Sequence, residues 1–245
     1  MFEVIEQAIA AWSDIVVPIF VDSEKTNLAA NGLGSAYLCA EGDRKFLVTA
    51  LHVVTDANKS KLQVANINGK GVDLGGLPFH VMESHDVAVA ELREEWIQSK
   101  GITSIKAAPV GRNLFGWRRT GIYVAIGYPG TKNRLDMRYG KVDRYCHSIS
   151  LKALNPCSIN TPIQDALCFS YDHEKVINSA GEQLGPQPDL YGMSGGPCLE
   201  LLSSKGPHPT YSFDPVGVLT EWHQKERAIV AAPLSAFFSR LSNEG

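Results

Sequence analysis

The sequence predicts an all-β protein made of two six-stranded antiparallel β-barrels, with short helices only at the two ends of the chain. Two observations predict this fold. Between residues 15 and 111, short runs rich in Val, Ile, Leu, Tyr and Phe are separated by Gly, Asn, Asp and Lys, the pattern of strands and turns. A second set of such runs follows between residues 121 and 234, without the strand–helix alternation of α/β proteins.

The elements follow in chain order. Apolar residues at helical spacing predict an N-terminal helix within residues 1–14. The first barrel is predicted over residues 15–112, from the runs IVVPIFV, GSAYLCA, KFLVTALHVV, KLQVANI, DVAVAEL and IKAAPVG. The second is predicted over residues 113–245, from GIYVAIGYPG, RYGKVDRYCHSI, DALCFSYD, GGPCLELL, PVGVLTEWH and RAIVAAPL. The tail PLSAFFSRLSNEG predicts a C-terminal helix.

Composition excludes several functional classes. The 245 residues are 44% hydrophobic and 20% charged, with a net charge of −3. No basic excess indicates a nucleic-acid or anionic membrane partner, and no apolar run is long enough to span a bilayer. The N-terminus lacks the basic and apolar regions of a signal peptide, so we expect a cytoplasmic protein.

The cysteines favour the same location. The chain has five, an odd number, and no pair has CxxC spacing. Free thiols in a reducing compartment are therefore the expectation. No Cys/His cluster has the spacing of metal ligands, so we expect no metal and no other cofactor. The five are Cys39, Cys146, Cys157, Cys168 and Cys198.

Three residues carry a possible chemistry. His52 ends a buried-looking strand in FLVTALH, Asp86 begins a strand in SHDVAVAEL, and Ser194 lies in the glycine-rich loop GMSGGP before another strand. A serine attacks a carbonyl when an imidazole takes its proton, and a carboxylate fixes the tautomer of that imidazole. The order His, Asp, Ser at three strand ends therefore predicts a catalytic triad.

These stretches resemble the trypsin/chymotrypsin-fold serine proteases. TALHVV resembles the family's TAAH segment, HDVAVAEL its Asp segment, and YGMSGGP its GDSGGP. GSAYLCAEGDRKFLVTALHVV and GIYVAIGYPG resemble the HtrA/Deg-like bacterial branch. The resemblance implies that Ser194 is the nucleophile, His52 the general base and acid, and Asp86 the orienting group. It also implies an oxyanion hole formed by the N–H groups of Gly192 and Ser194.

Two departures from the family pattern have consequences. Met193 stands where secreted zymogens have an Asp that pairs with a new N-terminus, so the IVVP segment at Ile15 is not expected to be an activation site. We also expect no PDZ domain of the kind that many HtrA-like proteases carry after the barrels. Substrate choice is then expected to come from the cleft or from a separate partner. The loop Glu174–Leu190 is a candidate regulatory element that orders on binding.

Several residues are candidates for choosing the substrate side chain, and the sequence does not rank them. Thr220 stands where the family pairs its backbone with the substrate, and Glu221 and Trp222 follow it at the cleft. Asp189 as the pocket base would favour Arg or Lys, and as an exposed turn residue it would have no such role. Ala231 beside Ala232 would suit a small or medium apolar side chain.

Three alternatives accompany the protease interpretation. GMSGG also fits the nucleophile elbow of α/β-hydrolases, although the expected βαβ alternation is missing. A silent, protease-like binding module would retain the residues with the wrong geometry. In the third alternative, His52, Asp86 and Ser194 do not meet in the fold. The chain has seven histidines, including His85 beside Asp86.

We therefore predict an intracellular, trypsin-like serine endopeptidase that acts on proteins or peptides. A dedicated protein partner, in a stress or antiviral defence pathway, is favoured over general quality control.

Overall fold

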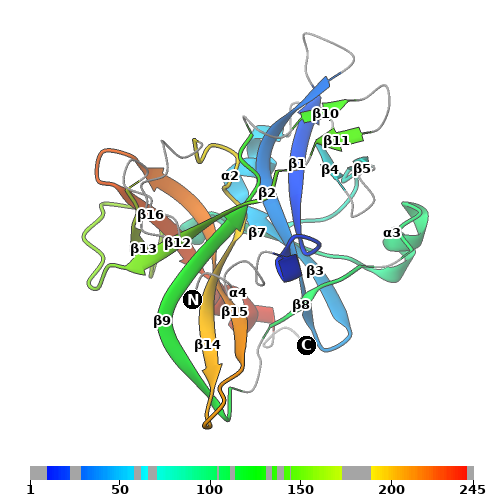
Figure 1. Ribbon diagram of the computed structural model, residues 1–245. Helices are drawn as coiled ribbons and strands as arrows, with labels where there is room; N and C mark the ends of the chain where they lie inside the picture. The colour runs from blue at the N-terminus through cyan, green and yellow to red at the C-terminus, as the bar shows by residue number, and fades with distance from the viewer. Residues whose placement is uncertain are drawn as a thin grey trace.

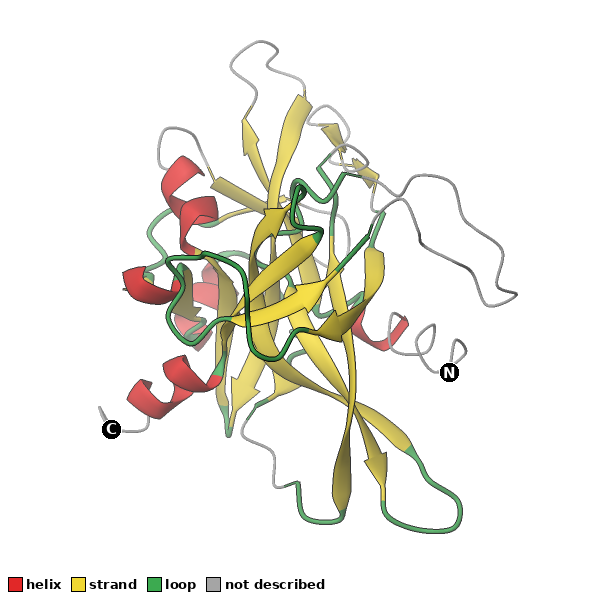
Figure 2. Ribbon diagram, turned by 90° about the vertical axis from the view of Figure 1, so that its left-hand side faces the viewer, coloured by secondary structure: helices red, strands yellow, loops and turns green. Residues whose placement is uncertain are grey.

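The computed structural model describes residues 10–22, 29–57, 62–65, 71–103, 105–110, 114–130, 134–136, 141–143, 145–172 and 189–241. Most of these residues lie in strands, and the few helices are short (Figures 1 and 2). The all-β prediction is therefore confirmed. Of the predicted N-terminal helix, residues 10–12 are helical, and residues 1–9 lie outside the described part.

The N-terminal half forms one sheet. Its strands are ordered β5-β4-β1-β2-β3-β7-β6, and every pairing along this path is antiparallel. Together with β8, β10 and β11 it has ten strands in the described residues, where the sequence predicted about six. The bounds are β1 Val16–Asp22, β2 Ala29–Glu41, β3 Arg44–Ala50, β4 Leu62–Ala65, β5 Gly71–Asp73, β6 His80–Met82, β7 Val87–Glu91 and β8 Ala108–Pro109.

Two of the extra strands come from the half predicted to form the second barrel. Strands β10 (Arg134–Asp136) and β11 (Lys141–Asp143) form a hairpin, and β10 pairs with residues 29–31 of β2. The reason lies in the length of β2. Strand β3 covers only residues 36–41 of one β2 edge, so the start of β2 leaves that edge open to another strand.

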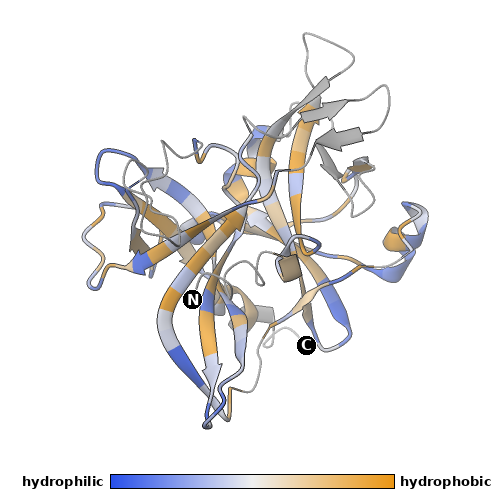
Figure 3. Cartoon of the chain, viewed as in Figure 1, coloured by the Kyte–Doolittle hydropathy of each residue, from blue (hydrophilic) through white to orange (hydrophobic). Residues whose placement is uncertain are grey.

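The C-terminal half closes into a six-stranded barrel in the order β12-β13-β16-β15-β14-β9, as predicted. Alternating and continuous apolar runs explain the strands, because β14 and β16 are buried over most of their length. Hydrophobic residues gather in the central parts of the strands (Figure 3). The bounds are β9 Trp117–Gly127, β12 His147–Ala153, β13 Leu167–Ser170, β14 Pro197–Ser204, β15 Tyr211–His223 and β16 Ala228–Pro233.

The two halves share a hydrophobic core. Val16 and Tyr37 of the first sheet belong to the same buried cluster as Val124 and Leu199 of the barrel. Helix α4 (Ser235–Leu241) is the predicted C-terminal helix, and it returns to the first half. There the ring of Phe238 meets that of Phe46 edge to face, with centroids 6.0 Å apart. This shared core holds the ends of strands from both halves in a fixed relation.

Two helices lie inside the chain, where the sequence predicted none. Helix α2 (Leu51–Ala57) directly follows β3, so the predicted strand KFLVTALHVV changes to helix at Leu51. Helix α3 (Glu94–Ser99) follows β7. Val53 of α2 and Ile97 of α3 are buried against the first sheet, and this packing outweighs the strand preference of the Val pair in α2.

The expectation of free thiols is wrong for two cysteines. Cys157 and Cys168 form a disulfide with a Cα–Cα distance of 5.3 Å, whereas Cys39, Cys146 and Cys198 are free. The bond joins the loop after β12 to strand β13. Disulfides persist in oxidising environments, so the cytoplasmic prediction loses this ground and stays a prediction.

Candidate active site

Asp86 stands at a turn that suits its short polar side chain. It follows the 3₁₀ turn Glu83–His85 and has a left-handed backbone (φ 52°), a conformation that Asp tolerates better than most residues. Its carbonyl accepts a hydrogen bond from the N–H of Leu51, at 2.9 Å. The start of β7 is thereby joined to the start of α2, the helix that carries His52.

The Asp86 carboxylate holds His52 through both oxygens. Oδ1 accepts the backbone N–H of His52 at 2.9 Å, and Oδ2 lies 2.6 Å from the ring Nδ1. A carboxylate accepts hydrogen bonds, so this contact places the imidazole proton on Nδ1 and leaves Nε2 as the basic nitrogen. The His52–Asp86 half of the predicted triad is therefore assembled.

The same contact sets the acidity of His52. Burial lowers the pKa of the imidazole, but the hydrogen bond and charge of Asp86 raise it, helped by the charges of Asp56 and Glu221. The net effect is a His52 pKa above its ordinary value of 6.5. A stronger base results, and it stays partly exposed, with 41% of its side-chain surface accessible.

The loop of Ser194 packs against the end of β3, two residues before His52. A Cβ atom built on Gly195 would lie 3.0 Å from the Ala50 nitrogen, and one on Gly34 would touch both Val53 of α2 and the Ser194 carbonyl. The structure thus brings Ser194 to the segment that carries His52. In the described residues, the Ser194 hydroxyl hydrogen-bonds the carbonyl of Thr220 at 3.2 Å, and not the His52 ring.

Two glycines allow the loop to take this path. Gly192 (φ 92°) and Gly195 (φ 87°) have backbone angles that other residues rarely adopt. A Cβ on Gly192 would lie 2.5 Å from the Gly130 nitrogen, and one on Gly195 would lie 2.0 Å from the Ser35 carbonyl oxygen. No side chain fits at either position.

Two N–H groups of this loop lack an acceptor in the described part of the chain. Most of their neighbours donate within the protein: Tyr191 to Asp189 Oδ1, Met193 to Leu190 O, Gly195 to Leu219 O and Gly196 to Met193 O. Only Gly192 and Ser194 have no bond of this kind in residues 191–196. These are the two predicted oxyanion-hole donors, and such paired, preorganised donors stabilise a developing oxyanion.

A small apolar pocket opens beside Ser194. Its volume is about 20 Å³, room for about one water molecule. Thr220 is the extra residue of a bulge, because the β15–β16 register shifts between Leu219 and Glu221. The pocket is lined by Ile149, Leu190, Met193, Ser194, Leu219, Thr220, Glu221, Trp222 and Ile229.

Three of the five predicted substrate-binding residues line this pocket, namely Thr220, Glu221 and Trp222. Asp189 does not line it: the side chain is exposed and accepts the Tyr191 N–H at 2.9 Å, as a turn residue does. Ala231 does not line it either; it is fully buried in the barrel core, where it pairs with Leu219. The loop Glu174–Leu190 lies outside the described residues up to residue 188.

Within the described ranges, no group of three or more His, Cys, Asp and Glu residues is placed to bind a metal ion. No helix in the described part of the chain is both long and apolar enough to cross a membrane.

Comparison with known proteins bears on the fold. No family model and no curated protein matches the sequence. Solved structures do match. A serine endoprotease from Yersinia pestis superposes with a TM-score of 0.53 at 18% identity, over 98% of this chain and 65% of that one. A structure from work on the coupled folding and binding of the Sesbania mosaic virus VPg protein gives 0.51 at 13% identity, over 93% and 90%.

The chain has a chymotrypsin-like fold. It spans 65% of the length of the Yersinia endoprotease, and at this identity the likeness concerns the fold. Sequence reasoning missed one part of the site in this chymotrypsin-like fold, the fully buried polar residues Ser35 and Thr49 beneath the loop. The only signal for Ser35 was its place in the GSAYLC run, where a serine precedes buried strand residues.

Proposed function

We propose that this chain is a serine endopeptidase, of the HtrA/Deg-like style that its motifs resemble, which cleaves peptide bonds through Ser194, His52 and Asp86. One observation carries the proposal. A carboxylate-oriented imidazole lies beside a glycine-rich serine loop in which the N–H groups of Gly192 and Ser194 have no acceptor among the described residues. This combination supplies a base and an oxyanion site at one serine.

The reaction follows from these groups. Rotation of the Ser194 side chain away from Thr220 O turns its hydroxyl toward His52 Nε2, which takes the proton as Oγ attacks the substrate carbonyl. The oxyanion binds the N–H groups of Gly192 and Ser194. His52 then gives the proton to the leaving amine, and the C–N bond breaks. Water repeats the attack on the acyl-enzyme, with His52 again as base, and frees Ser194 and a carboxylic acid.

The pocket supports a small apolar side chain before the cleaved bond. Its lining includes Ile149, Leu219 and Ile229, and Glu221 is the one charged residue among the described residues that line it. The Glu221 carboxylate is paired with His223 at 2.7 Å. We therefore propose peptides with Ala or Val at this position as the preferred substrates.

The small size of the pocket also supports an activating partner. Its volume of about 20 Å³ holds about one water molecule, so a valine side chain would need a wider pocket. A protein partner that opens the pocket would turn the chain on, and a dedicated partner in a stress or defence pathway fits such control.

The proposal is tested by labelling with a fluorophosphonate probe, with Ser194→Ala as the matched variant. We expect label on Ser194 alone, mapped by mass spectrometry, and none in Ser194→Ala. Label elsewhere, or equal labelling of the variant, would remove Ser194 from the role of nucleophile. A folded wild type that does not react, alone or with candidate partners, would contradict the endopeptidase proposal.

A second function has one observation in its favour. The Ser194 hydroxyl donates to the carbonyl of Thr220 and not to the His52 ring, as it would in a silent protease-like binding module. Apo active sites often have loose catalytic contacts that tighten on substrate binding, so the resting contact of Ser194 fits both functions. The labelling experiment decides between the two. Peptide binding without any labelling would favour the module.

The pH dependence of labelling or peptide cleavage follows from His52. The base must be neutral, and its pKa is raised above 6.5, so kcat/KM should climb with pH and level off only above that value. Glu221→Gln removes a charge that raises this pKa, so the acid limb should move to lower pH. Asp172→Asn, remote from His52 in an ion pair with Arg227, is the control and should leave the limb in place.

A further inference from the structure

Ser35 of β2 is a buried serine outside the triad, and all its polar groups are engaged. It is fully buried. Its hydroxyl donates to Gly192 O at 2.8 Å and accepts the Tyr128 N–H at 2.9 Å. Its own N–H donates to Ser194 O at 2.8 Å, and its carbonyl accepts the Thr49 hydroxyl at 2.7 Å. One residue of the first sheet thus binds two carbonyls of the nucleophile loop.

These bonds fix the orientation of the peptide units around the oxyanion hole. In a planar trans peptide the C=O and N–H point in opposite directions. The Ser35 hydroxyl holds Gly192 O, so the Met193 N–H points the other way, where it meets Leu190 O at 2.9 Å. The peptide between Gly192 and Met193 cannot turn over without breaking both bonds.

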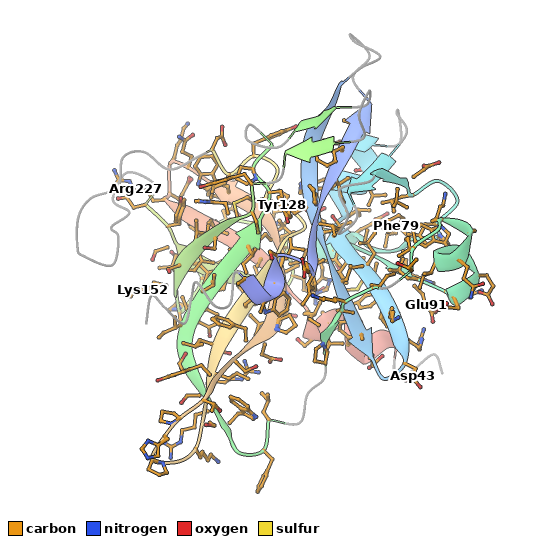
Figure 4. The ribbon with its side chains drawn as sticks, turned by 45° about the vertical axis from the view of Figure 1, so that its right-hand side comes forward. Asp43, Phe79, Glu91, Tyr128, Lys152 and Arg227 are labelled. Atoms are coloured by element: carbon orange, nitrogen blue, oxygen red, sulfur yellow. A yellow bond between two sulfur atoms is a disulfide. The ribbon has the colours of Figure 1, made fainter. Side chains whose placement is uncertain are left out.

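The Tyr128–Gly130 segment completes this arrangement. Tyr128 follows β9 and lies where that strand meets the first sheet (Figure 4). Its N–H binds the Ser35 hydroxyl, and two residues on, the Gly130 N–H donates to Tyr191 O at 2.8 Å. Because Tyr191 O is held in this direction, the N–H of Gly192 in the same peptide unit is turned away from Gly130.

Met193 has no charge, so the nucleophile loop is held by hydrogen bonds and not by an ion pair from this residue. Met193 lies between the two oxyanion donors and is 2% exposed in the apolar core of the barrel. Its side chain cannot form an ion pair, so no charge on this residue holds the loop. Hydrogen bonds hold the loop instead, and among the described residues the side chain that donates to a loop carbonyl is that of Ser35.

We propose that the Ser35 hydroxyl is the positioning group of the oxyanion hole, acting through Gly192 O and Tyr128 N. The inference rests on the proposed endopeptidase function and goes beyond it. Without the hydroxyl, a buried carbonyl and a buried N–H lose their partner. The 192–193 peptide, which lies between the Gly192 and Ser194 donors, is then held only by the Met193 bond to Leu190 O. A turn of this peptide would change the position of the two donors relative to each other.

The test compares Ser35→Ala with Ser35→Cys, which keeps a weak donor at similar size. We measure the rate of fluorophosphonate labelling per folded molecule and the kcat and KM of an Ala-containing peptide ester. Loss of one oxyanion donor costs about 10²–10³-fold, so a misplaced donor should lower kcat and labelling about 10–100-fold in Ser35→Ala. KM should change little, and Ser35→Cys should be intermediate.

Two further measurements separate a positioning role of Ser35 from a general loss of stability. The acid limb of the pH profile should not move, because Ser35 does not touch His52. Thr120→Val removes a hydroxyl that donates to Leu201 O at 2.7 Å, outside the site, and should leave the rate unchanged. If Ser35→Ala and Ser35→Cys both react at the wild-type rate per folded molecule, the positioning role is overturned. A wild type that never reacts overturns the endopeptidase proposal itself.

Discussion

Asp86→Asn should lower kcat by about 10⁴-fold while the protein stays folded. The amide oxygen of Asn can still accept the His52 backbone N–H, which Asp86 Oδ1 accepts at 2.9 Å. The amide NH₂, however, would face Nδ1, where Asp86 Oδ2 now lies at 2.6 Å. A donor at this position forces the imidazole proton onto Nε2. That nitrogen can then no longer take the proton of Ser194.

The measurement is the initial rate of peptide ester cleavage, with melting temperature as the check on folding. Asp73→Asn is the matched control, because Asp73 also accepts a backbone N–H, that of Gly75 at 2.8 Å, in a turn of the first sheet. It should leave kcat within about twofold, as surface substitutions usually do. Equal kcat values for the two variants would refute the orienting role of Asp86.

The sequence was informative where chemistry and strand pattern coincide. His52, Asp86 and Ser194 each stand at the boundary of a strand with a clear apolar run, so their place in the fold could be predicted from the residues around them. The contact between His52 and Asp86 follows from that placement. The Thr220 partner of the Ser194 hydroxyl depends instead on a bulge in β15, and a bulge leaves no mark in hydrophobic periodicity.

The strand pairing and the disulfide that join distant parts of the chain could not be predicted from the sequence, for similar reasons. The β10–β11 hairpin joins the first sheet because a stretch of β2 edge is open, which depends on where β3 ends. Cys157 and Cys168 pair because the loop after β12 returns to β13, and cysteine counting cannot show such a return. The specificity residues were hardest, since the distance of Asp189 from the pocket depends on the path of a loop.

The buried glycine beneath the nucleophile should be the most sensitive position for stability. Gly195→Ala puts a methyl group 2.0 Å from Ser35 O and 2.3 Å from Thr49 Oγ1, in a backbone with φ of 87°. The left-handed backbone costs about 1–2 kcal/mol for a residue with a Cβ. Forcing the buried neighbours apart adds about 1–3 kcal/mol. We expect the free energy of unfolding to fall by about 3 kcal/mol or more, with loss of labelling at Ser194.

Gly116→Ala separates these two contributions. Gly116 has the same φ of 87°, but a Cβ there meets no atom within 4 Å. The free energy of unfolding of this variant should therefore fall only by the cost of the left-handed backbone. Its labelling should match that of the wild type. Urea denaturation of both variants gives the difference, which measures how tightly the Ser194 loop is packed on Ser35 and Thr49. Equal losses of stability would mean that the loop moves to make room for the methyl group, and the expectation of tight packing around Gly195 would then be wrong.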